Sequence, residues 1–388
     1  IAGFRSENPQ LFRKTFSYFV KQLNRKGLTG NSLLAIDSSK FRAVNSKKNN
    51  FNQRKINRQL EYIDSKIQSY LSELDNGDLD ESKQVIIEQK LKKQKSQRKK
   101  YKRIEKQLQE KGLDQISTTD SDARSMIIHG SVIEVAYNVQ TVVDSKHNLV
   151  MEYEATNQND RKALLPMSQK AKRICETESI TVLADKGYHN GEQITGCEKE
   201  CITTFVSYQE VPRSHPIPTP EYYGERFKYL PKTDIYICPE GHKMKTTGHW
   251  YNKKYEQFVT KVKHYKTTAC RTCMAKQLCT RNPNGRLIER SEHAGAVERN
   301  NLRVKKNTSV YSKRQEIIEH IFGTIKRQWG FDHILLKGLT KNDGEFGLIY
   351  LIYNFRRVMN ILGPSKVKKW LKKLLLSIFT DRAVYPVS

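Results

Sequence analysis

The chain has 388 residues, enough for two or three domains with a sizeable hydrophobic core. Its 69 Lys and Arg against 41 Asp and Glu give a net charge of +28, which indicates a polyanionic partner. Nucleic acid is the first choice and an anionic membrane surface the alternative. No apolar run approaches the roughly 20 residues of a membrane-spanning helix, and no secretory signal is visible, so we expect no membrane partner.

The seven cysteines are an odd number in a large basic chain, which favours free or metal-bound thiols in a reducing cytoplasm. The first residue is Ile1 rather than Met, so we expect a fragment or a truncated reading frame.

The chain is predicted to begin with helix and then strand. Phe12, Phe16 and Phe19 recur at helical spacing within residues 1–30. Residues 33–37, Leu-Leu-Ala-Ile-Asp, then predict a short buried strand that ends at the carboxylate of Asp37.

A very polar helical pattern follows from residue 55 to residue 112. The Asp-Asn-Gly-Asp sequence at 75–78 breaks it, which predicts two antiparallel helices, the second over 81–110. Between Leu91 and Lys106 this basic hairpin carries nine Lys or Arg and a single acidic residue, Glu105.

Strands and helices are predicted to alternate over residues 133–208. Two strands flank the turn at 144–148 and form a hairpin, and a buried strand ends at Ala184, directly before Asp185. The predicted elements are strands 133–143 and 149–155, helix 161–175, strand 180–184, helix 191–200 and strand 202–208.

The last part of the chain contains a boundary and further helices. Residues 210–232 hold five prolines, and residues 233–290 are rich in turns and hold four of the seven cysteines. Helical patterns then cover residues 312–328, 345–362 and 366–379.

This order of elements predicts an α/β fold, a ribonuclease-H-like mixed sheet with flanking helices. A helical-hairpin insertion and a cysteine-containing insertion interrupt it. The predicted parts are residues 1–30 as the remnant of an N-terminal helical region, 31–209 plus 311–380 as the catalytic domain, 55–112 as the basic hairpin and 210–310 as the cysteine-containing insertion.

Three carboxylates are candidates for one metal site. Asp37 and Asp185 each follow an apolar strand, and the ends of neighbouring strands meet. Glu319 lies on the helix 312–328, on one face with Lys326. Hard oxygen ligands suit Mg²⁺ or Mn²⁺, and two such ions roughly 3.5–4 Å apart serve phosphodiester chemistry. The alternative is that a strand-terminal Asp is an ordinary turn or cap residue.

Four segments resemble the DDE transposases of bacterial insertion sequences, of the group with an insertion before the glutamate. They are ordered as in that family and cover nearly the whole chain. The segments are residues 34–37 (LAID) with 40–46 (KFRAVNS), 137–144 (YNVQTVVD), 184–188 (ADKGY) and 319–326 (EHIFGTIK).

The resemblance implies that Asp37, Asp185 and Glu319 are the catalytic triad. It also implies a tyrosine, arginine, glutamate and lysine signature on the late helix, matched by Tyr311, Arg314, Glu319 and Lys326. The interval from Arg314 to Glu319 is one residue longer than the common pattern of the family, so Arg314 does not match the signature spacing relative to Glu319. The intervals from Tyr311 to Arg314 and from Glu319 to Lys326 do match it. Family members usually have an N-terminal DNA-binding domain, and we expect most of it to be missing before the first strand of this chain.

The resemblance implies that the partner is double-stranded DNA, both the element ends and the target. It also implies a homodimer that assembles on the DNA. The implied location is the bacterial cytoplasm, in association with the nucleoid. Lys326 is expected to hold a phosphate, and Trp329 and Phe331 are more simply core residues than base-stacking ones. The basic hairpin either grips the DNA backbone or presents a solvated face. The DNA-binding candidates are Tyr311, Arg314, Lys326, Lys186, Lys92, Lys93, Lys99 and Lys100.

Four cysteines are candidates for a structural Zn²⁺ site: Cys238, Cys270, Cys273 and Cys279. Soft thiolates in a short, turn-rich segment suit tetrahedral zinc, and His242 is a substitute ligand. The alternative is free thiols in a degenerate insertion. Cysteines 175, 197 and 201 are expected to be core thiols.

Two further residues near the carboxylates are expected to be structural. Asp122 is a turn or cap residue rather than a ligand, and His320 packs or forms hydrogen bonds beside Glu319.

The sequence thus predicts a metal-dependent transposase that cleaves DNA at element ends and joins them to target DNA. The alternatives are a stand-alone ribonuclease-H-like nuclease, which cleaves without joining, and an inactive DNA-binding remnant of a decayed element.

Overall fold

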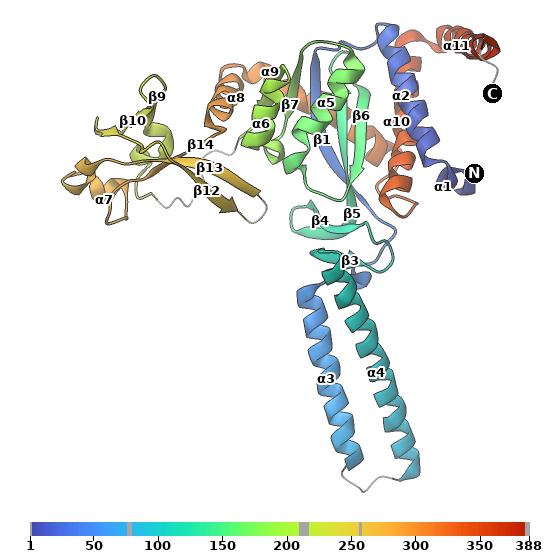
Figure 1. Ribbon diagram of the computed structural model, residues 1–388. Coiled ribbons are helices and arrows are strands. Elements are labelled where there is room, and N and C mark those ends of the chain that lie inside the picture. Colours follow the sequence, from blue (N-terminus) through green and yellow to red (C-terminus); the bar gives the residue numbers. More distant parts are fainter. Residues whose placement is uncertain (1, 76–79, 209–216, 256–257, 385–388) are drawn as a thin grey trace. The chain divides into compact units, whose positions relative to one another are not determined.

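A computed structural model describes residues 2–75, 80–208, 217–255 and 258–384 (Figure 1). The chain divides into two compact units. The first comprises Ile1–Asp160, Lys170–Thr177 and Gln315–Ser388, and the second comprises Arg161–Gln169 and Glu178–Arg314. Strands paired in antiparallel and in parallel fashion occur together with many helices, so the predicted mixed α/β class is confirmed.

The sheet of the first unit is centred on the long strand β5 (Val132–Asp144), which pairs antiparallel with β1 (Leu33–Arg42), β4 (Arg124–His129) and β6 (Leu149–Thr156). The expected end of the first strand at Asp37 is wrong. The strand continues to Arg42 because the backbone from Asp37 onward pairs with β5, from Asp37 opposite Thr141 to Arg42 opposite Ala136. Asp37 therefore lies within a strand.

Two helices of the first unit pack side by side, α2 (Pro9–Arg25) and α10 (Leu339–Leu362) (Figure 1). They approach so closely that a Cβ added to Gly344 of α10 would lie 2.4 Å from the Cα atom of Pro9. The shorter α1 (Ala2–Glu7) and the terminal α11 (Pro364–Val384) accompany them.

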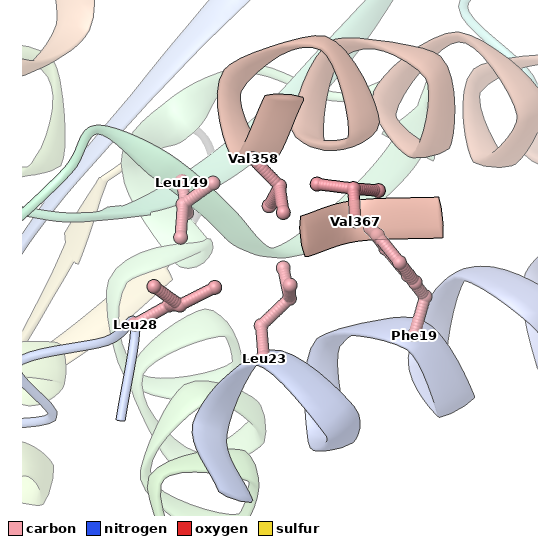
Figure 2. Packing of buried hydrophobic residues seen from close by; sticks show 6 residues of the cluster. All are labelled: Phe19, Leu23, Leu28, Leu149, Val358 and Val367. Atoms are coloured by element: carbon pink, nitrogen blue, oxygen red, sulfur yellow. The ribbon is translucent and has the colours of Figure 1, made fainter. Parts of the chain in front are cut away.

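Figure 2 shows the core that joins these helices to the sheet. Apolar side chains of α2, β6, α10 and α11 meet there, and each is at most 6% exposed. The periodic residues of the N-terminal helix thus face the core as the sequence predicts, and burial of this kind stabilises by roughly 25 cal/mol per Å². The residues are Phe19, Leu23, Leu28, Leu149, Val358 and Val367.

The basic segment forms the expected helical hairpin, α3 (Gln53–Asp75) and α4 (Glu81–Glu110), which run side by side (Figure 1). Residues 76–78 of the predicted break at 75–78 lie outside the described residues. The base of the hairpin has a small core together with the short strands β2 (Asn50–Asn52) and β3 (Gln115–Ser117). The core residues are Phe51, Ile56, Leu60, Ile104, Leu108 and Ile116.

The second unit contains a parallel pair, β7 (Ile180–Ala184) and β8 (Ile202–Val206), with the helices α6 (Gly191–Lys199) and α8 (Ala294–Lys306) packed against β8. No pattern in the sequence predicted α8. Its buried Asn300 accepts the N–H of Val206 at 2.9 Å and donates to the carbonyl of Val206 at 2.8 Å, which fixes α8 on the end of β8.

The cysteine-containing part of the second unit consists of two small antiparallel sheets. One contains β9 (Lys228–Leu230), β10 (Ile235–Ile237) and β11 (Lys243–Met244). The other contains β12 (Trp250–Tyr255), β13 (Phe258–Tyr265) and β14 (Ile288–Ser291). The short helix α7 (Lys276–Cys279) follows the cysteine pair.

Two helices contain residues of both units, α5 (Leu164–Cys175) and α9 (Thr308–Phe322). Across the described ranges, no helix is long and apolar enough to cross a membrane.

Candidate active site

Asp37 lies near the middle of β1, directly after the buried residues 34–36. Its side chain is partly exposed, and its Oδ1 accepts the backbone N–H of Ser38 at 2.7 Å. Strand pairing on β5 holds the backbone here, so the carboxylate projects from a rigid element.

A second carboxylate, Asp160, lies beside β1 and was not among the residues predicted from the sequence. Asp160 accepts hydrogen bonds from the side chains of Asn138 and Gln140, both at 2.7 Å, and forms an ion pair with Lys40 at 3.4 Å. Burial alone would raise the pKa of Asp160, but Lys40 and the hydrogen bonds, including one from Ser38, lower it. No periodicity marks Asp160, because its partners are distant in sequence.

Glu319 is exposed on α9, whose other side buries Ile317, Ile318 and Ile321. Its Oε1 accepts a hydrogen bond from Gln315 Nε2 at 2.7 Å, one turn earlier on the helix. Beyond Phe322 the chain continues as a π-helix over Gly323–Gln328. Such distortions are frequent at functional sites because they redirect side chains.

His320 has the structural role that the sequence predicts. The hydroxyl of Tyr353 donates to the carbonyl of Asn148 at 3.0 Å, so it accepts from Nδ1 of His320 at 2.8 Å. Nε2 then accepts from Arg357 at 3.2 Å. Burial and the nearby Arg357 lower the pKa of His320, which favours this neutral form. The network fastens the helix of Glu319 to α10.

Lys326 lies in the π-helix and is half-buried. Its ammonium donates to the backbone carbonyl of Lys40 at 2.6 Å and lies 4.4 Å from the centre of the Phe41 ring. Burial lowers the pKa of Lys326 to about 8, and the charges of Lys40 and Arg42 contribute. The segment that follows Glu319 is thereby attached to the strand that carries Asp37.

Asp185 belongs to the second unit, whereas Asp37 and Glu319 belong to the first. It follows β7 at the predicted position and begins the 3-10 turn Lys186–Tyr188, where its Oδ1 accepts the N–H of Lys186 at 2.6 Å. The Lys186 side chain is exposed. Asp185 is therefore a cap residue, as the alternative interpretation had it, and capping does not prevent a carboxylate from binding metal.

The remaining signature and aromatic residues have diverse surroundings. The guanidinium of Arg314 lies 6.0 Å from the ring of Tyr311, and both are in the second unit. The ring centroids of Phe331 and Phe41 lie 5.9 Å apart, and those of Trp329 and Tyr353 lie 6.5 Å apart. Both Trp329 and Phe331 are only partly buried, so neither is the fully buried core residue that was expected.

Asp122 accepts the N–H of Leu339 at 3.0 Å and so caps α10, as expected. The hairpin lysines Lys92, Lys93, Lys99 and Lys100 are all exposed on α4.

The four candidate zinc ligands line one cavity of the second unit. The cavity residues include Cys238, Cys270, Cys273 and Cys279, together with His242. Among the residues that the structure describes, however, no three or more His, Cys, Asp or Glu side chains are grouped so that they could hold a metal ion.

Residues 237–359 match a protein family described as "Transposase DDE domain". The matched span contains Glu319 and Lys326 as well as the four cavity cysteines. Over this span the match supports a DDE transposase of an insertion element. The segments of Asp37 and Asp185 lie outside the matched residues. No curated protein and no solved structure matches the chain.

Proposed function

We propose that the protein is a DNA transposase that cleaves phosphodiester bonds at insertion-sequence ends and joins those ends to target DNA. The DDE family implies a metal-dependent nuclease and strand transferase in general. The further proposal is that this chain performs the reaction with two divalent ions, Mg²⁺ or Mn²⁺, held by Asp37, Asp185 and Glu319 in a ribonuclease-H-like domain.

One structural observation supports this assignment above the others. The matched family segment carries Glu319, and its Lys326 is hydrogen-bonded to the backbone of β1, the strand of Asp37. Two of the three proposed ligands are thus on directly connected elements of the first unit, although they lie 282 positions apart in the sequence.

The donor set suits the proposed ions. Carboxylate oxygens are the preferred ligands of Mg²⁺ and Mn²⁺, and the side chains of Asp37, Asp185 and Glu319 are all at least partly exposed. When bound, such ions activate the attacking oxygen and stabilise the leaving oxygen of a phosphodiester.

The chain itself contributes orientation and charge. Strand pairing on β5 holds Asp37, and the hydrogen bonds of His320 hold the helix of Glu319. The Asp160–Lys40 pair places a fixed cation on the same strand as Asp37. In DNA cleavage the nucleophile is water, and in joining it is the 3′-hydroxyl that cleavage releases. Lys326 and Lys186 are proposed to bind phosphates near the site.

The basic hairpin is the proposed grip on double-stranded DNA. Its exposed lysines on α4 neutralise phosphates without reading sequence. We further propose that two copies of the chain assemble on the DNA ends, because both ends of an element must be cut and joined together.

The test is metal-dependent nicking of supercoiled plasmid and cleavage of a labelled duplex that carries the inverted repeats flanking the gene. Cleavage with joined products supports transposition. Cleavage without joining would favour the stand-alone nuclease, and binding without any nicking would favour an inactive remnant.

A further inference from the structure

The second unit contains a small cavity that the proposed DNA chemistry does not use. Its volume is about 20 Å³, and its walls include the side chains of Cys238, Cys270, Cys273 and Cys279. A space of roughly 10–15 Å³ holds one water molecule, so this cavity has room for a single atom-sized guest. No disulfide joins the four cysteines, each of which is partly buried.

The backbone around Cys238 forms a tight turn that holds its sulfur in place. The carbonyl of Cys238 accepts the N–H of Gly241 at 2.9 Å, which closes a tight turn just after β10. The sulfur of Cys238 accepts the N–H of His242 at 3.3 Å. The turn and this contact together fix the position of the sulfur beside the cavity.

The position of Cys270 depends on a glycine. Gly285 has a φ of +89°, and a Cβ there would lie 2.6 Å from the Cβ of Cys270. Only glycine therefore lets the loop after α7 close over this cysteine. Cys273 lies three residues further on, and the N–H of Lys276 donates to its carbonyl at 3.1 Å, which turns the chain toward Cys279.

A partly buried cation borders the same cavity. Arg286 lies 5.4 Å from the centre of the Phe227 ring, and its buried Nε has no hydrogen-bond partner within the described part of the chain. A guanidinium with a buried, unpaired N–H beside neutral thiols is poorly compensated. Four thiolates around one divalent ion carry a net charge of −2, which would stabilise Arg286.

We propose that Cys238, Cys270, Cys273 and Cys279 bind one structural Zn²⁺ ion. Thiolates are soft ligands that select zinc over Mg²⁺, and four of them complete its tetrahedral coordination. The sulfurs surround the cavity without yet being grouped to hold a metal, so binding turns the side chains inward until each sulfur lies about 2.3 Å from the ion. Each thiol releases its proton to solvent as it binds.

Zinc would compensate for a small hydrophobic core. Only a handful of buried side chains packs beside the cavity, and Cys238 and Cys279 contact them. Bonds from one zinc ion to Cys238, which follows β10, to Cys270 and Cys273, and to Cys279 of α7 would link these segments. They would order this part of the chain in place of a larger hydrophobic core. The core residues are Phe227, Tyr236, Met244, Tyr265 and Ile288.

The experiment is metal analysis of the full chain purified without chelator. We expect about one equivalent of zinc in the wild type and less than about one tenth in Cys270→Ser and Cys273→Ser. The matched control is Cys201→Ser, which should retain zinc because Cys201 belongs to the same unit but lies outside the cavity. Cys201 is exposed, so its expected role as a core thiol is wrong.

A second measurement does not depend on how the variants fold. Zinc is removed from wild-type protein with a chelator, and thiol reactivity is followed as Zn²⁺ or Co²⁺ is returned. Four thiols should become protected, and Co²⁺ should give the absorption bands of tetrahedral thiolate coordination. Less than about one tenth of an equivalent of zinc in the wild type with no protection of thiols would overturn the proposal, as would bound iron or disulfides among these cysteines.

The zinc proposal is independent of the proposed function. Zinc bound at the carboxylates instead would persist in the cysteine variants and disappear in Asp185→Asn. A chain that binds zinc at the cysteines but cleaves no DNA would contradict the transposase proposal alone.

Discussion

The ammonium of Lys326 donates a hydrogen bond of 2.6 Å to the backbone carbonyl of Lys40. The two residues join the π-helix that follows Glu319 to the strand that contains Asp37. The two residues are close in space but 286 positions apart in the sequence. Because the Lys326 ammonium is half-buried, the contact also predicts that stability depends on pH.

Burial lowers the pKa of Lys326 to about 8, below the roughly 10.4 of an exposed lysine in an unfolded chain. Between these values the unfolded chain binds more protons than the folded one, so the free energy of unfolding should rise from pH 8 to pH 10. In Lys326→Met the free energy of unfolding should rise less with pH than in the wild type. Urea unfolding at pH 7.5 and pH 9.5 measures this difference. The control is Lys146→Met, which removes an exposed ammonium that also donates to a carbonyl, 2.7 Å from the oxygen of Gly27. Equal pH dependence in wild type and Lys326→Met would refute the burial argument.

Substitution of the proposed metal ligands should abolish cleavage. Substituting a residue that merely hydrogen-bonds to a metal ligand typically lowers metal affinity or activity roughly 10–100-fold. Removing the charge of a ligand itself should cost more. We therefore expect Asp37→Asn, Asp185→Asn or Glu319→Gln to reduce nicking at least about 100-fold. The readout is nicking of supercoiled plasmid with Mg²⁺ or Mn²⁺. Glu316→Gln is the matched control, because Glu316 is an exposed glutamate on the same helix. Wild-type nicking by Asp185→Asn would show that the site is wrongly assigned.

Neutralising the basic hairpin should reduce the salt dependence of DNA binding. Each lost phosphate contact lowers the slope of log K against log salt by about 0.9, so four contacts account for up to about 3.6. Affinity for unrelated sequences should fall alike, because phosphate contacts carry no sequence information. The residues changed to glutamine are Lys92, Lys93, Lys99 and Lys100.

The control for the hairpin is a second fourfold variant, in which exposed cations on α2 and at its C-cap are changed to glutamine. Its slope should change less than that of the hairpin variant. If both variants have the slope of the wild type, the hairpin is a solvated face. The control residues are Lys14, Lys21, Arg25 and Lys26.

The packing of α2 against α10 should tolerate no side chain at position 344. A Cβ there would lie 2.4 Å from the Cα of Pro9, which is backbone and cannot rotate away. Gly344→Ala should therefore lower the free energy of unfolding by about 1–3 kcal/mol. Urea unfolding provides the measurement, with Gly323→Ala as control, since no atom lies within 4 Å of a Cβ added there. A stabilised Gly344→Ala would mean that the helices are further apart than described.

The sequence by itself determined the elements whose signals are local. The 3.6-residue spacing of Phe16 and Phe19 predicted α2, and the charged pattern broken at 75–78 predicted α3 and α4. The apolar run before Asp185 gave β7 with its observed ends. Helical and strand periodicity arise from the chain's own geometry, so a short window of residues contains them.

Only the tertiary structure decided what depends on distant partners. The strand of Asp37 extends to Arg42 because β5 pairs with it, and Asn300 joins α8 to β8 by hydrogen bonds that no periodicity announces. The partner of Lys326, the network of His320 and the cavity of the four cysteines likewise depend on residues that folding brings together. Such contacts follow from packing and hydrogen-bond satisfaction across the whole unit, which no local stretch of sequence specifies.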